Sequence, residues 1–206
     1  MKKIFAMVAV AAGLLFAGNA NAQMSVYFGY SPESWTNENS TTSMNSIFVG
    51  AGQNVPLSGA LNAMIGAQLR CGFATEEGSF YGLASGKKTT TLIGVDVPVL
   101  LNYSLNLASD LKLTLFAGPK VNLGIVGKDK VVLNTIVGNG EYEHNWYDAD
   151  DLNLNRFNVS ATFGLALGLQ QFNLFGGYNY GLLDMDNNDN TKTTISGLFF
   201  GLGMAL

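Results

Sequence analysis

The sequence predicts an all-β protein: a transmembrane, antiparallel, up-and-down β-barrel of eight strands. Three observations predict this fold. Long segments alternate apolar residues with small or polar ones, and a period of two is the period of a β-strand. The charged residues inside the middle four segments all fall on the phase opposite to the apolar residues. Short and long connections alternate along the chain, as they do in outer-membrane barrels.

The first residues have the order of a secretory signal peptide. Two lysines precede an apolar run over 4–16, and the small-residue sequence ANA follows at 20–22. This order predicts cleavage after Ala22. We therefore expect residues 1–22 to be removed during export, and residues 23–206 to form one barrel domain in the outer membrane.

The composition excludes several classes of protein. Only 13% of the residues are charged, where soluble domains average about 25%, yet 48% are hydrophobic. Without the two N-terminal lysines, nine basic residues stand against fifteen acidic ones, and an acidic balance argues against a nucleic-acid partner. The single cysteine, Cys71, cannot form an intramolecular disulfide, so we expect it to face lipid as a small apolar residue.

Eight segments show the alternation. The third, LNAMIGAQLRCGF, carries an apolar residue at every odd position, and the sixth repeats this pattern from Phe157 to Leu169. Several of these segments, at 13 to 16 residues, exceed the usual ~5–6 of globular sheets and suit a tilted membrane crossing of ~9–11 residues with some overhang. The predicted strands are 24–31, 44–55, 61–73, 89–104, 111–124, 154–169, 172–181 and 192–206.

The connections between these segments fall into two kinds. Short ones follow the second, fourth and sixth segments, and long polar ones follow the first, third, fifth and seventh. Short periplasmic turns and longer extracellular loops are typical of outer-membrane barrels. The short connections are 56–60, 105–110 and 170–171; the long ones are 32–43, 74–88, 125–153 and 182–191.

The charges indicate which face meets lipid. A Lys or Arg on the lipid face near mid-bilayer costs about 2–4 kcal/mol, so such residues are expected to point inward. Every charge within segments three to six lies on the non-apolar phase, whereas Lys192 shares the apolar phase at the loop end of the last segment. We therefore predict that the apolar side chains face lipid and that these charges face the lumen: Arg70, Asp96, Lys112, Lys120 and Arg156.

Four of these residues form the candidate site, a lumen charge cluster of Arg70, Asp96, Lys120 and Arg156. Two interpretations stay open. The charges can form a plug, because buried ions must be paired, and Asp96 with carboxylates from the loops could pair them. They can also line an anion-attracting vestibule. Eight strands leave little interior space, which favours the plug.

Aromatic residues on the lipid phase gather near the strand ends, where amphipathic rings prefer the membrane interface. The predicted girdle consists of Tyr30, Phe73, Phe157, Tyr178 and Tyr180 at the loop rim, with Tyr103 and Phe172 at the turn rim.

The chain resembles the PorT-like family of small outer-membrane β-barrel proteins of Gram-negative bacteria. The resemblance rests on VPVLLNY (97–103), LFAGPKV (115–121), RFNVSATFGLALGL (156–169) and GYNYGLL (177–183), and covers nearly all of the chain after residue 22. It implies an eight-stranded, porin-like barrel in the outer membrane and no settled biochemical role.

Two loop motifs carry candidate chemistry, and neither predicts a metal or cofactor. DMDNNDN (184–190) starts like a calcium loop, but lacks the glycine at its sixth position and the glutamate at its twelfth. The only histidine, His144, lies among acids and aromatics in EYEHNWYDADD (141–151), where one imidazole is too few for a metal site. Without a GxSxG-type elbow, we expect no enzyme and no cofactor.

These observations predict a rigid barrel that presents polar loops outside the cell, with a structural or surface-interaction role. Rigid scaffolds commonly carry binding in their loops, and the longest loop is 125–153. The alternative is a narrow conduit for small solutes or secretion, because glycines on the lumen phase leave space; a lipid-modifying enzyme is a third, disfavoured hypothesis. The expected partners are outer-membrane lipid, the barrel-assembly machinery, and an extracellular or protein partner bound by the loops.

Overall fold

The computed structural model describes residues 23–36, 41–80, 84–135, 138–148, 154–186 and 192–206. These residues form nine strands, and every strand pairing is antiparallel. Among them, no helix has the length and apolarity needed to cross a bilayer. The strands are β1 (Gln23–Thr36), β2 (Thr41–Ser58), β3 (Leu61–Phe80), β4 (Ala84–Asn106), β5 (Leu111–Thr135), β6 (Gly138–Asn145), β7 (Phe157–Leu169), β8 (Phe172–Gly181) and β9 (Thr194–Ala205).

Eight of these strands close into a ring. Each pairs with its neighbour in the order β1, β2, β3, β4, β5, β7, β8, β9, and β9 returns to pair with β1. The ring confirms the predicted eight-stranded up-and-down barrel. The first strand begins at Gln23, directly after the predicted cleavage site. Residues 1–22 lie outside the described residues, so the signal peptide stays a prediction.

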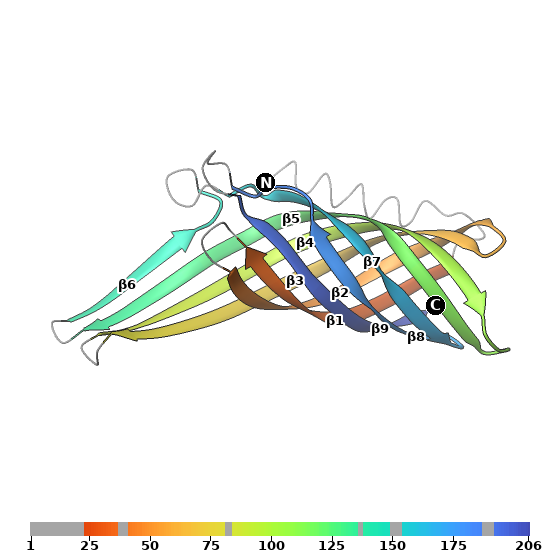
Figure 1. Cartoon of the computed structure of the whole chain (residues 1–206), viewed down its shortest axis with the longest axis horizontal. Helices are drawn as coiled ribbons and strands as arrows, with labels where there is room; N and C mark the ends of the chain where they lie inside the picture. The colour runs from red at the N-terminus through yellow and green to blue at the C-terminus, as the bar shows by residue number, and fades with distance from the viewer. Residues whose placement is uncertain (1–22, 37–40, 81–83, 136–137, 149–153, 187–191) are drawn as a thin grey trace.

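The ninth strand corrects the predicted loops. The sequence predicts polar connections over 74–88 and 125–153, but much of both is strand. β3 and β4 stay paired out to Phe80 and Ala84, and β6 pairs with the last eight residues of β5. Backbone pairing along these hairpins satisfies N–H and C=O groups that a loop would leave to water. The ends of β3, β4 and β5, together with β6, therefore form one sheet that reaches beyond the rest of the barrel (Figure 1).

A bulge shifts the phase of β5 where this sheet leaves the barrel. Ile93 pairs with Val126 while Gly94 pairs with Gly124, so Ile125 is an extra residue on β5. An extra residue moves every following side chain to the opposite face. Asp129 consequently points inward, although the inward residues lower on β5 have even numbers.

Two of the turns at the opposite rim are tight. Gly59 in the β2–β3 turn and Gln170 in the β7–β8 turn both have φ of 54°. Hairpin turns of two residues need φ above zero, which glycine adopts without strain and Gln170 adopts at some cost.

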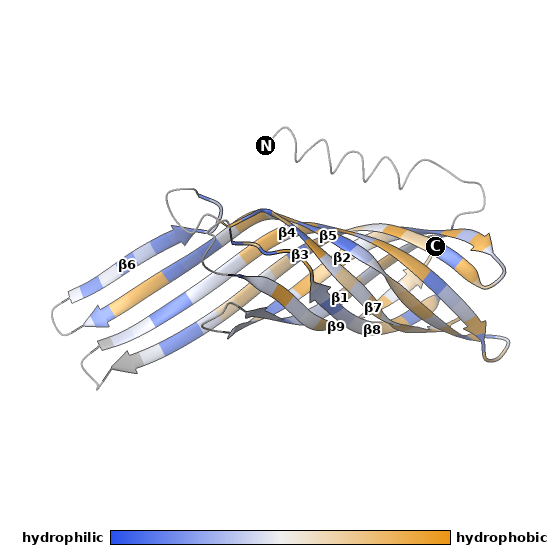
Figure 2. Cartoon of the chain, turned by 45° about the horizontal axis from the view of Figure 1, so that its top comes forward, coloured by the Kyte–Doolittle hydropathy of each residue, from blue (hydrophilic) through white to orange (hydrophobic). Residues whose placement is uncertain are grey.

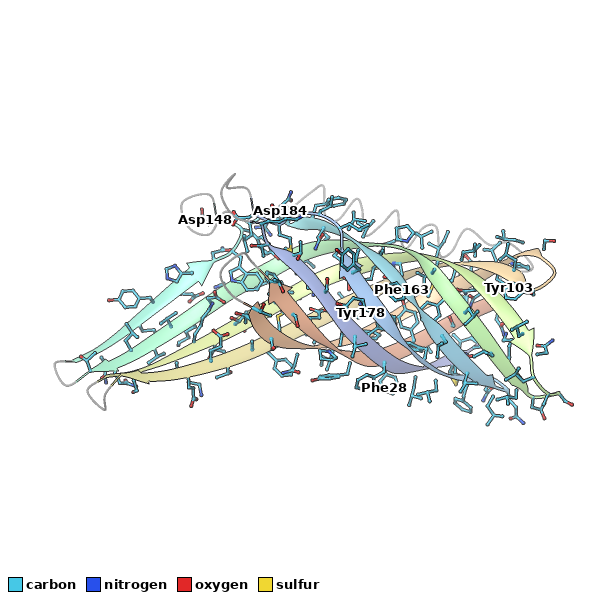
Figure 3. The ribbon with its side chains drawn as sticks, viewed as in Figure 1. Phe28, Tyr103, Asp148, Phe163, Tyr178 and Asp184 are labelled. Carbon is cyan, nitrogen blue, oxygen red and sulfur yellow. The ribbon has the colours of Figure 1, made fainter. Side chains whose placement is uncertain are left out.

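The two faces of the barrel have opposite chemistry. Leu69, Leu165 and Phe28 are more than half exposed on the outer face, whereas Asp96 and Ser46 are fully buried inside. Figure 2 shows apolar colour over the barrel strands and polar colour over β6. Figure 3 shows Phe28, Phe163 and Tyr178 on the outside of the barrel, and the rings of the last two lie 5.9 Å apart. The prediction that the apolar phase faces outward is confirmed.

Candidate functional site: the barrel lumen and the loop-side sheet

Arg70 is the centre of a buried ion cluster in the lumen. Its Nη1 lies 2.9 Å from Oε2 of Glu33, and its Nε lies 3.3 Å from Oδ2 of Asp96. The three side chains come from β3, β1 and β4, and none is more than 6% exposed. One guanidinium therefore bridges two carboxylates that are shielded from water, a geometry that its fork of donors suits.

Neutral donors complete the shells of both carboxylates. Gln68 and Asn122 each donate an amide N–H to Asp96, both at 2.9 Å. Ser46 donates its hydroxyl to Glu33 at 3.2 Å, while the single hydroxyl proton of Ser31 is shared between the carbonyl oxygen of Leu198, at 2.9 Å, and Glu33, at 3.4 Å. Glu33 thus accepts from Arg70 and from neutral hydroxyls, whereas Asp96 accepts from two amides and lies beside the guanidinium as an ion pair. These contacts offset the cost of taking the carboxylates out of water.

Lys120 lies beside this cluster without joining it. Its side chain projects inward from β5 and is only 6% exposed. Among the described residues, no carboxylate oxygen lies within 4.0 Å of its Nζ, and both spaces inside the lumen border on this side chain. The ammonium is therefore a buried donor beside a cluster whose acceptors are already occupied.

Two of the charges predicted to face the lumen border its spaces near the rims and do not contact the cluster. Arg156 precedes the first residue of β7 and is exposed; it donates to the carbonyl of Ile125 at 3.0 Å and lies over the ring of Tyr147, 4.4 Å from its centroid. Its position ahead of the strand allows the guanidinium to reach water at the loop rim. Lys112 is exposed near the turn rim, where it lines the inner cavity described below. Arg70, Asp96 and Lys120 come together; Arg156 does not join them.

Glu33 is a member of the cluster that the sequence does not predict, because its pattern indicates a loop over 32–43. β1 instead continues to Thr36, and Tyr27, Ser31 and Glu33 all lie inward on its odd phase. After Pro32 the outward positions Ser34 and Thr36 are polar, so the sequence carries no apolar alternation that could have found it.

The loop side of the lumen is capped by aromatic residues. Trp146, from the segment after β6, is 4% exposed and packs with Met44, Ala74 and Leu92. Its ring lies 4.5 Å from that of Trp35. Glycines make room for the cap, since a Cβ at Gly127 or Gly124 would overlap the rings of Trp146 or Tyr147.

A second aromatic layer lies on the other side of the charge cluster. Tyr27, Phe48 and Phe199 form its buried core, and Phe116 and Phe175 pack against them. Neighbouring ring centroids are 6.1 to 6.5 Å apart, and Tyr27 meets Phe48 and Phe175 edge to face. This layer replaces much of the small, polar lumen lining that the sequence suggested.

The two sides of the cluster differ in free space. Towards the turn rim, a cavity of about 450 Å³ runs from Asp110 and Gln170 up to Glu33, Arg70 and Lys120. Towards the loop rim, the space between the cluster and Tyr147 is about 20 Å³. The lumen is therefore closed on the loop side and hollow on the turn side.

The loop-side sheet of β3 to β6 carries exposed ion pairs. Lys87 lies 2.8 Å from Glu77, Lys130 lies 2.7 Å from Glu141, and Lys128 pairs with Glu143. Hydrogen bonding and then charge from Lys87 hold the pKa of Glu77 below its ordinary value of 4.5, and Lys128 does the same to the pKa of Glu143.

The inward face of this sheet is different. Lys88 and Thr90 both contact Asp129, at 3.0 and 2.6 Å. Further out, Leu133 and Tyr142 are 40% and 57% exposed. The outward face of the sheet thus carries ion pairs. The inward face carries the polar contact at Asp129 and, further from the barrel, exposed apolar side chains.

The remaining loop candidates fit structural roles. Asp184 accepts backbone N–H groups from Asp186 and Thr193, which makes it a turn residue at the loop rim (Figure 3), while residues 187–191 of DMDNNDN lie outside the described residues. His144 lies on β6 opposite Asp129. Cys71 is exposed on the outer face. In the described part of the chain, no group of three or more His, Cys, Asp or Glu side chains is placed to hold a metal ion.

A closed antiparallel ring with an apolar exterior, a polar interior, short turns at one rim and long hairpins at the other defines an outer-membrane β-barrel. Here the barrel has a lumen blocked on its loop side. The chain belongs to the family of outer membrane protein beta-barrel domains, whose family model matches residues 4–187. It is therefore an outer-membrane protein; the narrower PorT-like resemblance stays a prediction.

Solved structures with a similar fold are distant in sequence. Ail, the attachment invasion locus protein of Yersinia pestis, in complex with the heparin analogue sucrose octasulfate, is 12% identical over 90% of this chain and 99% of its own, with a TM-score of 0.46. Neisserial surface protein A is 12% identical over 89% and 97%, with a TM-score of 0.44. A major outer membrane protein of Thermus thermophilus is 14% identical over 90% and 99%, with a TM-score of 0.39. Likeness of this degree says nothing about ligand or partner. No curated protein matches the sequence significantly.

Proposed function

We propose that this protein is a structural and surface-interaction barrel that binds a macromolecular partner outside the cell through the loop-side sheet of β3 to β6. The observation that carries the proposal is the division of the molecule into a blocked lumen and a sheet that extends past it. A barrel of this form is suited to displaying a surface.

The blocked lumen supports display over conduction. Any solute crossing the barrel would have to pass the Arg70 cluster and then the layer of Trp35 and Trp146. Buried ion pairs and packed rings argue against a continuous path for water or ions, because interiors of eight-stranded barrels are just wide enough for side chains to fill.

The loop-side sheet supports binding. Its paired strands hold their side chains in fixed positions, unlike a flexible loop, and a preorganised surface loses less entropy on association. One face of the sheet carries salt bridges, whose side chains offer a partner charges of both signs. The other face carries the exposed Leu133 and Tyr142, which offer apolar contacts.

The test removes the outermost hairpin without opening the cap. Trp146 donates its backbone N–H to the carbonyl of Gly127 at 2.9 Å, so residues 128–145 can be replaced by an Asn-Gly turn. We expect cells that display this variant to lose adhesion to epithelial monolayers and matrix-coated plates. The control replaces 107–110, at the opposite rim, with the same turn. A folded hairpin variant that adheres as the wild type does would refute the proposal.

The conduit alternative has its own measurement. In planar bilayers we expect the wild-type barrel to be silent. A steady conductance that changes when Arg70 or Lys120 is neutralised would favour a conduit instead.

We also propose that the barrel is not an enzyme, and that residues 1–22 are cleaved before the assembly machinery inserts the barrel into lipid. Mass spectrometry of protein from outer membranes should then find Gln23 as the first residue. A lipid-modifying activity lost in His144→Ala would contradict the first statement, and an intact N-terminus would contradict the second.

A further inference from the structure

We infer that the turn-side cavity is a binding site for a small organic carboxylate with an apolar body, which enters from the periplasmic rim. The cavity measures about 450 Å³, within the usual range of ligand pockets, about 300–1,000 Å³. It runs from the turn rim to the charge cluster, where a ligand would meet the buried side chains of Glu33, Arg70 and Lys120. This inference is independent of the loop-side sheet.

The closed end of the cavity presents donors in excess of acceptors. Glu33 already accepts from Arg70 and Ser46, and Asp96 accepts from Gln68 and Asn122 and forms an ion pair with Arg70. Lys120 also lines the cavity, and no described carboxylate oxygen lies within 4.0 Å of its Nζ. A buried ammonium with no close acceptor favours a ligand that brings an anionic one.

Tyr27 supplies a second, independent donor. Its side chain lines the same cavity, is 9% exposed, and has an Oη with no hydrogen-bond partner among the described residues. Leaving a buried hydroxyl unpaired costs free energy that a ligand oxygen would recover. A carboxylate has two oxygens, which suits one ammonium and one phenol donor.

The walls next to these donors are apolar. Phe48, Phe116, Phe175 and Phe199 line the cavity. Rings packed edge to face or tilted at centroid distances near 6 Å are the environment that an aromatic or short aliphatic body prefers. An inorganic anion would leave this wall without a partner, so the chemistry selects an organic acid.

The test uses 4-fluorobenzoate as the probe, because it is soluble and carries a ¹⁹F nucleus for NMR. The full mature barrel is inserted in lipid nanodiscs and titrated. We expect saturable binding with a Kd of about 1 mM or tighter, and at least about tenfold weaker binding of the neutral analogue 4-fluorobenzamide. Equal binding of acid and amide, or no saturable binding, would overturn the inference.

Substitutions test which residues of the cavity bind the probe. Lys120→Met should weaken binding at least about tenfold, and Tyr27→Phe, which removes only the hydroxyl, about three- to tenfold. Lys112→Met is the matched control: it removes a lysine from the same cavity near the rim and should bind as the wild type does.

Lys120→Arg keeps a cation at the closed end and should retain most of the affinity. It therefore tests the role of the charge even if Lys120→Met does not fold. If Lys120→Arg binds the amide and the acid alike, or if Lys112→Met loses binding as Lys120→Met does, the probe is held by general electrostatics or the membrane, and the assigned site is wrong.

Discussion

The barrel lumen and the loop-side sheet both contain ion pairs between a basic side chain and a carboxylate, but the pairs are buried in the lumen and exposed on the sheet. In the lumen, Arg70 and its two carboxylates are at most 6% exposed, whereas the side chains of Lys87 and Glu77 on the sheet are 54% and 68% exposed. Water screens the second pair and competes for its hydrogen bonds, whereas the first pair is almost wholly enclosed by protein. An ion pair of this kind therefore contributes strongly to stability inside the barrel and little on the sheet.

The largest difference is expected when one cation is removed from each region. Arg70→Met leaves Glu33 and Asp96 buried without a counter-ion and should cost about 3–5 kcal/mol of unfolding free energy. Lys87→Met should be hard to distinguish from the wild type, because Glu77 is left in water. Urea unfolding in lipid vesicles, followed by heat-modifiable mobility on gels, measures both. Equal stability of the two variants would show that the lumen cluster is not buried as described.

An intermediate effect is expected from one substitution made in both regions. Leu165 is 54% exposed on the outer face of β7, and Leu165→Arg should cost about 2–4 kcal/mol because that face meets lipid. Leu133→Arg, on the sheet, should change stability little, since its exposed side chain meets water. The same vesicle assay compares them, and similar tolerance of both would place β7 outside the membrane.

The smallest effect concerns pH and belongs to the sheet. The pKa values of Glu77 and Glu143 lie below their ordinary value, first through hydrogen bonds and then through charge from Lys87 and Lys128. A lowered folded pKa gives stability that is present above pH 4.5 and lost as the pH falls through the folded value. Carboxyl ¹³C NMR should therefore show midpoints below 4.5 at low salt that move up in high salt. Unshifted midpoints without salt dependence would mean that these pairs do not form in solution.

The same two regions show what can be predicted from sequence. Inside the barrel, alternation with a period of two fixes the face of each side chain, so the inward direction of Arg70, Asp96 and Lys120 could be predicted from phase alone. Which groups they contact could not, since Glu33 lies far from Arg70 in the chain and the tilt of the strands decides which inward residues meet. The aromatic layer was missed for the same reason: its members come from five different strands.

In the loop-side sheet the sequence signal is weaker. Gly86, Lys87 and Lys88 show no apolar alternation, because both faces of that part of β4 are polar or only partly buried. Polar strands are hard to tell from loops by composition. The bulge at Ile125 further changes the phase, so the direction of Asp129 could not be predicted from Lys120 on the same strand.

The pairing of β1 with β9 has a consequence for biogenesis. The strand that is exported first must find the strand that is exported last, so the wall cannot seal until the whole domain has been delivered. Until then the sheet has two edges with unpaired backbone groups, which hydrocarbon does not tolerate. Those edges must therefore stay out of hydrocarbon until the ring closes, and a chain that stops before Thr194 lacks β9 and cannot close it.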